Sequence, residues 1–294
     1  MIESKSIGRR SFLLANHIFL AILAFLCLFP LIHVLAVSLS SSVAASAGKV
    51  TLWPVGWNLS AYKFVLNKEA FLLSFGVSVK RVLLGTVLNM LMVLITAYPL
   101  SKEAAIFKWR TFYAWYFLVT ILFSGGLIPA YMTVKMTGLI DSIWALILPG
   151  IVPVTSVILM LNFFRGLPKE LEESAYIDGA GPFRTLWSIY IPLSAPAIAT
   201  LTLFSMVGHW NSWFDGIIYM NLPEHYPLQS YLRTVLIDKT LTAASAAEAE
   251  LMKILSNRTI NAAQIFLGAL PILMVYPFLQ KFFIKGIVVG SVKE

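Results

Sequence analysis

Cysteine is nearly absent from this chain of 294 residues, which has a single one, Cys27. One thiol cannot form a disulfide or a thiolate metal site within the chain. His17, His33 and His225 have no second ligand at helical spacing, so we expect no metal site. The sequence also lacks a phosphate loop of the form G-x-x-x-x-G-K-S/T, so it shows no means of binding ATP, and we expect no cofactor of its own.

Charged residues are also few, at 12% of the chain, whereas 59% is hydrophobic. Both values lie far from those of soluble proteins and place the chain in a bilayer. A hydrocarbon core of about 30 Å requires a run of about 20 apolar residues for each helix that crosses it. Such runs predict one all-α, polytopic membrane domain over residues 1–294 with six transmembrane helices, at about 12–38, 71–100, 111–134, 142–164, 186–210 and 261–284.

The first apolar run resembles a signal peptide because Lys5, Arg9 and Arg10 precede it. It is too long for one and lacks a small-residue cleavage site before Ser40, so we interpret it as a retained span. The net charge of +8 does not indicate nucleic-acid binding, because there is no soluble domain to carry a basic patch. The lysines and arginines instead predict, by the positive-inside rule, a protein of the cell inner membrane with both termini in the cytoplasm.

The loop between the fourth and fifth runs is rich in glutamate. Pro168 suits a first helical turn, and the acidic residues after it stabilise the helix dipole. Gly179 is suited to a left-handed C-cap. The pattern predicts a short amphipathic helix at about 167–180, then a turn at Gly181-Pro182 and a second helix. A helix lying on lipid headgroups is the alternative, and repulsion of its three carboxylates by an anionic leaflet disfavours it.

The same loop resembles the EAA loop of bacterial ATP-binding-cassette (ABC) importers, because Glu173 is followed by small residues and by Gly179, and then by Ile189-Tyr190-Ile191-Pro192. Other segments narrow the resemblance to the second permease subunit of maltose-type carbohydrate importers, in the subgroup that imports complex oligosaccharides. Those segments are Leu52-Trp53-Pro54, Asn58-Leu59-Ser60-Ala61-Tyr62, Ala97-Tyr98-Pro99-Leu100-Ser101, Gly125 to Pro129, and Tyr276-Pro277-Phe278-Leu279-Gln280-Lys281 with Lys285-Gly286. Ser174 departs from the alanine of the pattern, and Val292-Lys293-Glu294 departs from its C-terminus.

The resemblance implies a type I importer permease that is not itself an enzyme. Its partners would be a homologous second permease, two ATPase subunits that hold ATP and Mg²⁺, and an external solute-binding protein that delivers an oligosaccharide. The glutamate-rich helix would dock in a cleft on one ATPase and carry its movement to the spans. The residues expected to couple the chain to the ATPase are Glu172, Glu173, Ser174, Ala175, Asp178, Gly179 and Ala180.

Polar residues inside the spans predict a substrate path, because a charge at the bilayer centre costs about 2.5–3.5 kcal/mol. Lys80 and Arg81 lie about halfway along the second span, and Arg81 shares a helical stripe with Gly85, Asn89, Met92 and Thr96. No acidic residue lies near that depth in spans one to four, and Asp141 and Asp215 lie near the outer boundary. An anionic sugar, such as a uronate oligosaccharide of the alginate type, is therefore the favoured counter-charge. A carboxylate of the partner permease, or a pair that snorkels to the outer surface, remains open.

The outer end of span five adds aromatic and polar residues to this path, namely His209, Trp210, Asn211, Trp213 and Asp215. Aromatic faces pack on sugar rings, and amides and carboxylates bind hydroxyls, so the set suits a sugar. It suits an interfacial aromatic belt or a contact with the binding protein equally well. The outer loop 211–259, with an alanine-rich middle at 241–255, is expected at the outer surface, where the binding protein would dock.

Two other functions remain open on the sequence alone. An importer of amino acids or inorganic anions would share the glutamate-rich loop but should lack Leu52-Trp53-Pro54 and the Gly125 to Pro129 segment. An intramembrane enzyme acting on a lipid-linked sugar would need an acid/base pair or a metal cluster, and none has workable spacing.

Overall fold

The computed structural model describes residues 7–238 and 256–291, which form helices joined by loops. The chain divides into two compact units. Unit 1 comprises Met1–Glu69 and Val235–Leu270, and unit 2 comprises Ala70–Thr234 and Pro271–Glu294.

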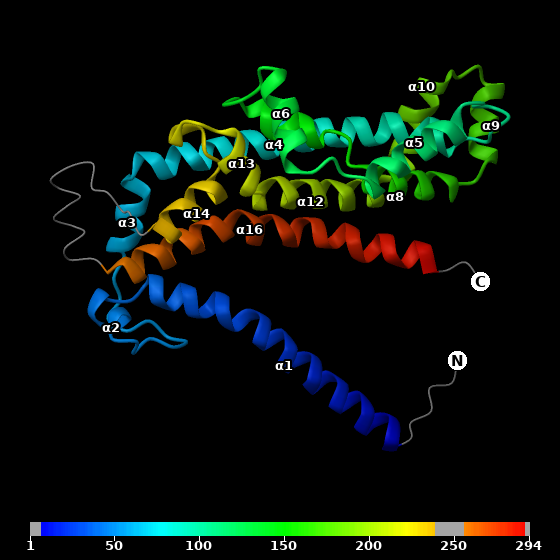
Figure 1. Cartoon of the computed structure of the whole chain (residues 1–294). Coiled ribbons are helices and arrows are strands. Elements are labelled where there is room, and N and C mark those ends of the chain that lie inside the picture. The colour runs from blue at the N-terminus through cyan, green and yellow to red at the C-terminus, as the bar shows by residue number, and fades with distance from the viewer. Residues whose placement is uncertain (1–6, 239–255, 292–294) are drawn as a thin grey trace. The chain divides into compact units, whose positions relative to one another are not determined.

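The described part of unit 1 includes α1 (Ile7–Ser38), α2 (Ser42–Ser46), α3 (Ser60–Asn67) and the first part of α16 (Asn257–Ser291), which continues in unit 2 from Pro271 (Figure 1). Its small core joins Val37 of α1, Ala45 of α2 and Ala262 of α16. The Arg258 guanidinium also donates to the Ala45 carbonyl at 3.2 Å. Most of α1 exposes large apolar side chains, as a helix surrounded by lipid would.

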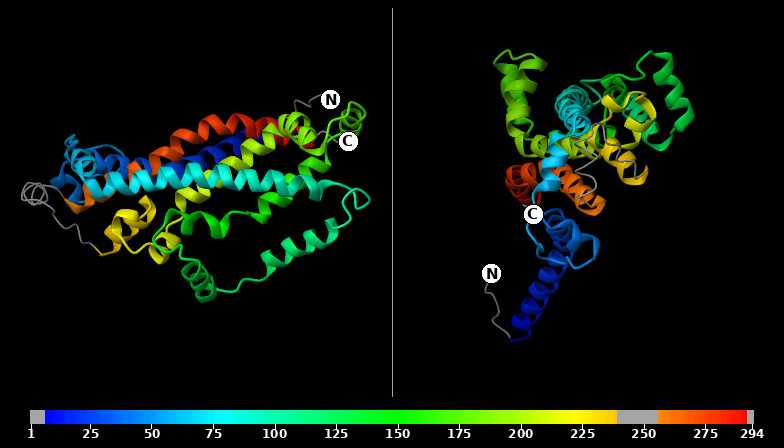
Figure 2. Two further views of the ribbon diagram at one scale, coloured as in Figure 1. Left: turned by 90° about the horizontal axis from the view of Figure 1, so that it is seen from above. Right: turned by 90° about the vertical axis from the view of Figure 1, so that its left-hand side faces the viewer.

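Unit 2 is built along the long helix α4 (Glu69–Ser101). The end of unit 2 where α4 finishes carries α9 and α10, and the end where α4 begins carries α13 (Figures 1 and 2). Its other elements are α5 (Arg110–Leu122), α6 (Leu127–Met136), α7 (Ile143–Ile147), η1 (Leu148–Gly150), α8 (Val154–Arg165), α9 (Glu170–Ile177), α10 (Pro182–Thr185), the π-helix η2 (Leu186–Tyr190), α11 (Ile191–Leu193), α12 (Ala195–Asn211), α13 (Phe214–Tyr219), η3 (Pro223–His225) and most of α14 (Leu228–Asp238).

Among the residues that the structure describes, three helices are long and apolar enough to cross a membrane, at residues 11–38, 69–101 and 257–277. They coincide with the first, second and sixth predicted spans. The predicted third, fourth and fifth spans each fall on two helices, which meet at bends of 115°, 48° and 83°. The described residues therefore provide up to six spans, if each bent pair is one span. The alanine-rich stretch 241–255 and the C-terminal residues 292–294 lie outside the described residues.

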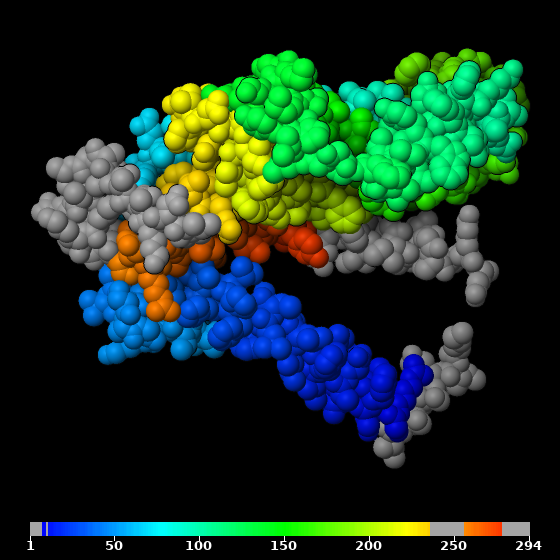
Figure 3. Space-filling view, in the orientation of Figure 1, coloured from blue at the N-terminus to red at the C-terminus, as the bar shows by residue number. Residues whose placement is uncertain are grey.

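The bends have local causes. Gly126 takes a φ of 84°, a conformation that favours glycine, directly before α6. Pro153 precedes α8, and the break at Ser194 lies between Pro192 and Pro196. With 13 residues, α5 is about 20 Å long, too short to cross a hydrocarbon core of about 30 Å by itself. No residue of α5 is buried, and α5 and α6 lie on the visible surface of unit 2 (Figure 3).

The main core of unit 2 lies where α4, α8 and η2 meet. Val93 and Ala97 of α4 are fully buried, as is Met160 of α8. Tyr98, Phe164 and Tyr190 close this core with edge-to-face rings at centroid distances of 5.0–6.4 Å. The aromatic cluster therefore fixes the last turns of α4 and α8 against the beginning of the fifth span.

Candidate functional site

Helix α9 carries the glutamate-rich motif and ends as the sequence predicts. Three acidic residues occupy its first turn. Gly179 has a φ of 76°, and its N–H donates to the Tyr176 carbonyl at 3.0 Å. The next N–H, of Ala180, donates to the Ala175 carbonyl at 2.9 Å. These two hydrogen bonds form a Schellman motif, in which a left-handed residue satisfies the last carbonyls of the helix.

The two faces of α9 have different environments. Ala175 is the one buried residue of this helix. Glu173, Ser174 and Asp178 are exposed, and Ile177 is 85% exposed. The smallness of residue 175 is thus explained by packing within this chain. The exposed residues form a surface of mixed charge and apolar character beside the Gly179 turn.

Glu172 points inward from α9 into a polar cluster, which we call the Glu172 clamp. Its carboxylate accepts hydrogen bonds from Lys102 Nζ at 2.5 Å, Tyr190 Oη at 2.6 Å and Tyr176 Oη at 2.8 Å. The Lys102 ammonium also lies 4.0 Å and 4.1 Å from the ring centroids of Tyr98 and Tyr190. Because a buried ammonium needs compensation, both the carboxylate and the two aromatic faces stabilise it.

The ionisation of the clamp follows from its surroundings. Burial alone would raise the pKa of Glu172, but the hydrogen bonds from Lys102, Tyr190 and Tyr176 outweigh burial and hold that pKa below its usual value. Burial lowers the pKa of Lys102, and the hydrogen bond and charge of Glu172 oppose this change. The carboxylate is therefore ionised at neutral pH and faces the lysine.

Arg81 on α4 is 3% exposed and forms an ion pair with Asp215 on α13. Its Nη1 donates to Asp215 Oδ1 at 3.1 Å, and its Nη2 donates to the Leu146 carbonyl at 3.3 Å. Ser212 Oγ and the Gly216 N–H also donate to Asp215 Oδ1, at 2.8 Å and 2.9 Å. The guanidinium is thus compensated within this chain.

This pair corrects the expectation that no carboxylate lies at the depth of Arg81. Along an unbroken fifth span, Asp215 would lie at the outer boundary. The chain instead leaves α12 at Asn211 and returns as α13, which brings Asp215 to the guanidinium. Lys80, by contrast, is exposed. The charge of Arg81 therefore provides no argument for an anionic substrate.

A second polar group lies between α4 and α12. With its amide oriented to satisfy both ends, Asn89 donates to the carbonyls of Gly85 and Ile151 at 3.2 Å and 3.3 Å, and accepts from Ser205 and His209, both at 3.2 Å. A Cβ on Gly85 would lie 2.5 Å from His209 Nε2. The absence of a side chain at Gly85 therefore allows α12 to approach α4 closely.

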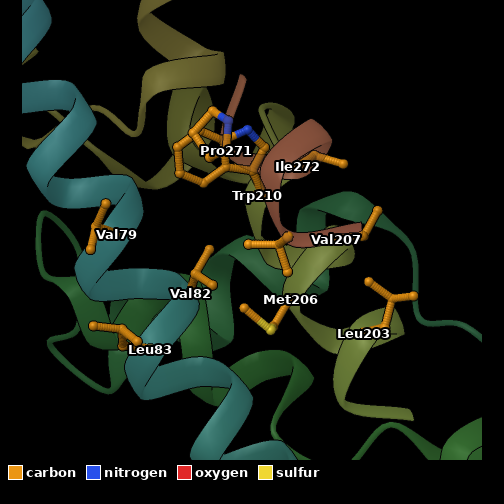
Figure 4. A pocket seen from close by; sticks show the side chains of 10 residues that line it. Val79, Val82, Leu83, Leu203, Met206, Val207, Trp210, Pro271 and Ile272 are labelled. Carbon is orange, nitrogen blue, oxygen red and sulfur yellow. The ribbon is translucent and has the colours of Figure 1, made fainter. Parts of the chain in front are cut away.

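The remaining predicted path residues lie apart from this polar group. Trp210 is 5% exposed, packs edge-to-face on Phe75 at 5.7 Å, and lines an apolar pocket of about 210 Å³ between α4, α12 and α16 (Figure 4). Hydroxyl-rich sugars do not suit such a lining. Asn211 is exposed, and the Arg233 guanidinium lies 4.8 Å from the Trp213 ring centroid. No group of three possible metal ligands occurs in the part of the chain that the structure describes.

No family model matches the chain. LplC of Bacillus subtilis (strain 168) is 39% identical over 284 residues, which cover 97% of this chain and 95% of LplC. YtcP of the same organism, named as a polygalacturonan/rhamnogalacturonan transport system permease protein, is 38% identical, over 94% of this chain and 96% of YtcP. A solved bacterial ABC transporter involved in the import of the acidic polysaccharide alginate has a chain that is 32% identical, with a TM-score of 0.87, over 95% of this chain and 98% of that one.

This chain belongs to the permease family of sugar ABC transporters. The all-α, polytopic fold of a type I importer permease, which the resemblance of the sequence implied, is confirmed. The permease is a multi-pass protein of the inner membrane.

The sequence does not predict the roles of Lys102 and Tyr190 in these clusters. Lys102 directly follows the second span, and Tyr190 lies in the segment from Ile189 to Pro192. Gly85 lies on the helical stripe of Arg81 and Asn89, but the sequence alone does not show that His209 of α12 packs against it.

Proposed function

We propose that this permease passes oligosaccharides of the acidic, uronate class from an external binding protein into the cytoplasm by alternating access, driven by ATP. Two similar proteins support the class of substrate, since one is named for polygalacturonan and rhamnogalacturonan and the other imports the acidic polysaccharide alginate. Asn89, Ser205 and His209 form a polar group between the apolar helices α4 and α12, and the half-buried Ser205 and His209 would meet sugar hydroxyls on a path along these helices.

The complex we propose contains this chain, a homologous second permease and two ATPase subunits. ATP and Mg²⁺ are bound by the ATPases, because this sequence has no phosphate loop. Both termini and α9 face the cytoplasm, which the distribution of lysine and arginine supports. The permease itself performs no chemistry, and its part is to convert movement of the ATPases into movement of its spans.

The observation that carries this proposal is the geometry of α9. The helix is short and capped, and it is exposed along the side that carries Glu173, Ser174 and Ile177. An exposed isoleucine on a helix otherwise rich in carboxylates is suited to burial in a cleft of a partner. The Gly179 turn has no neighbour within 4 Å of the place where a Cβ would be, so a partner can approach it closely.

Gly179→Asp in the reconstituted complex tests this coupling. The variant places a side chain and a charge at the docking turn, in a conformation that costs a residue other than glycine about 1–2 kcal/mol. We expect the stimulation of ATP hydrolysis by the loaded binding protein to fall by about fivefold or more, since couplings between sites are typically worth about 5- to 150-fold.

Gly138→Asp is the matched control. Gly138 has a φ of 70° and ends α6 with the same pair of hydrogen bonds, and its Cβ position is also free of neighbours. It therefore carries the same backbone strain without being part of α9. Equal loss in both variants would attribute the effect to strain, and unchanged stimulation in Gly179→Asp would remove α9 from the mechanism.

The class of substrate is tested by uptake into proteoliposomes that contain the complex and its binding protein. Uronate oligosaccharides should be taken up in preference to neutral oligosaccharides of the same length. A preference for the neutral sugars would refute the acidic class while leaving the coupling intact.

A further inference from the structure

Helix α9 is held to unit 2 by very few side chains. Of its eight residues only Ala175 is buried. A cleft of about 570 Å³ runs along it, lined by Lys102, Glu172 and Tyr190 among other residues. Continuous apolar packing therefore does not attach α9 to the spans. Two ion pairs do so, namely the buried Lys102–Glu172 pair and the exposed pair between Lys169 and Glu103.

These two ion pairs differ in what they can transmit. Lys169 and Glu103 are 72% and 61% exposed, and exposed pairs contribute little because water competes for both charges. Lys102 and Glu172 are 7% and 13% exposed, and the carboxylate accepts three hydrogen bonds. A largely buried carboxylate that accepts three hydrogen bonds cannot shift without breaking several contacts at once.

Two of the three partners of Glu172, Lys102 and Tyr190, connect it to different spans, and the third, Tyr176, lies on α9 itself. Lys102 follows the last residue of α4, and Tyr190 ends the π-helix η2 at the start of the fifth span. The Tyr190 ring also packs on Tyr98 of α4 and Phe164 of α8. π-Helical turns frequently occur at functional sites, and here the turn places a tyrosine between the helix that would dock and the core.

We infer that Glu172 is a positioning residue, which transmits displacement of α9 to α4 and to the fifth span through Lys102 and Tyr190. This inference rests on the proposed coupling of α9 to an ATPase. The exposed residues of α9 would meet that partner, whereas Glu172 faces away from it and acts through the spans.

The test compares Glu172→Gln and Lys102→Met with Glu103→Gln in the reconstituted complex. The readout is the ratio of ATP hydrolysis with and without loaded binding protein, together with the number of ATP molecules hydrolysed for each sugar imported. Both clamp variants should lower the ratio by about fivefold or more and raise the ATP cost of each sugar. Glu103→Gln, which removes the exposed ion pair, should change neither the stimulation ratio nor the ATP cost. Lys102→Arg, which keeps the positive charge, should retain most of the wild-type ratio.

Several results would overturn the inference. One is a wild-type ratio of ATP hydrolysis in Glu172→Gln together with a lowered ratio in Gly179→Asp. This result would support docking of α9 on the ATPase but would show that the Glu172 clamp has no role in coupling. Another is an equal loss in Glu103→Gln, which would attribute the effect to surface charge. If Gly179→Asp also keeps the wild-type ratio, the proposed function itself fails.

If the Glu172→Gln variant does not assemble into a complex, Tyr190→Phe tests the same transmission through the Glu172 clamp. This variant keeps the ring in the core and removes one hydrogen bond to the carboxylate. A lowered ratio in the assembled Tyr190→Phe complex supports the inference, and an unchanged ratio overturns it.

Discussion

Replacing Asp215 by asparagine should destabilise the permease, because it removes the counter-charge of Arg81. Breaking a buried ion pair costs about 3–5 kcal/mol, since the remaining charge is left uncompensated. Arg81 is 3% exposed but Asp215 is 24% exposed, so we expect the lower end, about 3 kcal/mol. For a chain of this size that corresponds to a fall in apparent melting temperature on the order of 6–12 °C.

The measurement is the melting temperature of the purified complex, combined with uptake of uronate and neutral oligosaccharides. Asp215→Asn should lower the melting temperature and reduce uptake of both sugars. The double variant Arg81→Met/Asp215→Leu should recover most of the stability, because apolar replacement of a buried pair is often neutral. Lys80→Gln, a change at the exposed neighbouring cation, should stay within about 0.5 kcal/mol of wild type.

One result would refute this reasoning. If Asp215→Asn has the melting temperature of the wild type and loses uptake of uronate oligosaccharides alone, the carboxylate is not the counter-charge of Arg81. The guanidinium would then be available to an anionic sugar, as the sequence suggested.

Three further predictions concern packing, pH and topology. Gly85→Ala should lower the free energy of unfolding by about 1–3 kcal/mol, because it forces a Cβ against the imidazole of His209 on α12. Gly76→Ala, on the same helix with no neighbouring atom within 4 Å, should not destabilise the protein. Equal melting temperatures of the two variants would contradict the close approach of α12 to α4. Burial alone would raise the pKa of Asp141, but hydrogen bonds from two backbone N–H groups and an imidazole outweigh burial and hold that pKa below its usual value. The ionised carboxylate therefore stabilises the folded protein above about pH 4, and this stabilisation is lost as the pH falls through the lowered pKa. Asp141→Asn should therefore flatten the acid limb of a plot of melting temperature against pH, and an unchanged limb would assign it to other groups. With the native cysteine replaced, an impermeant thiol label outside sealed cells should modify Ser245→Cys but not Ser174→Cys, and the reverse would invert the topology.

Local features of this fold were predictable from the sequence because their causes are local. Long runs of mostly apolar residues define α1, α4 and α16. The cap of α9 follows from one glycine after an acidic first turn, and Gly181-Pro182 begins α10 as expected. None of these features depends on what lies beside the helix.

The bends within the third, fourth and fifth spans and the contacts between distant residues were not predictable in the same way. Glycine and proline within an apolar run hardly change its hydropathy, so Gly126 and Pro153 did not interrupt the predicted spans. Depth counted along an unbroken span then misplaced Asp215, which is 134 residues from Arg81 in the sequence. Such a contact depends on how helices return on one another, and a single sequence does not record that.

The π-helix η2 limits how this part of the chain can change in length during evolution. An α-helix turns by about 100° per residue, and a π-helical turn accommodates one extra residue within that path. Deleting one residue between Leu186 and Tyr190 would restore the α-helical path and turn the side chains on one side of the deletion by about 100° relative to those on the other. Tyr190 could then no longer reach both Glu172 and the aromatic core. We expect insertions and deletions among homologues to fall in the loops, while the segment from Gly181 to Pro192 keeps a constant number of residues.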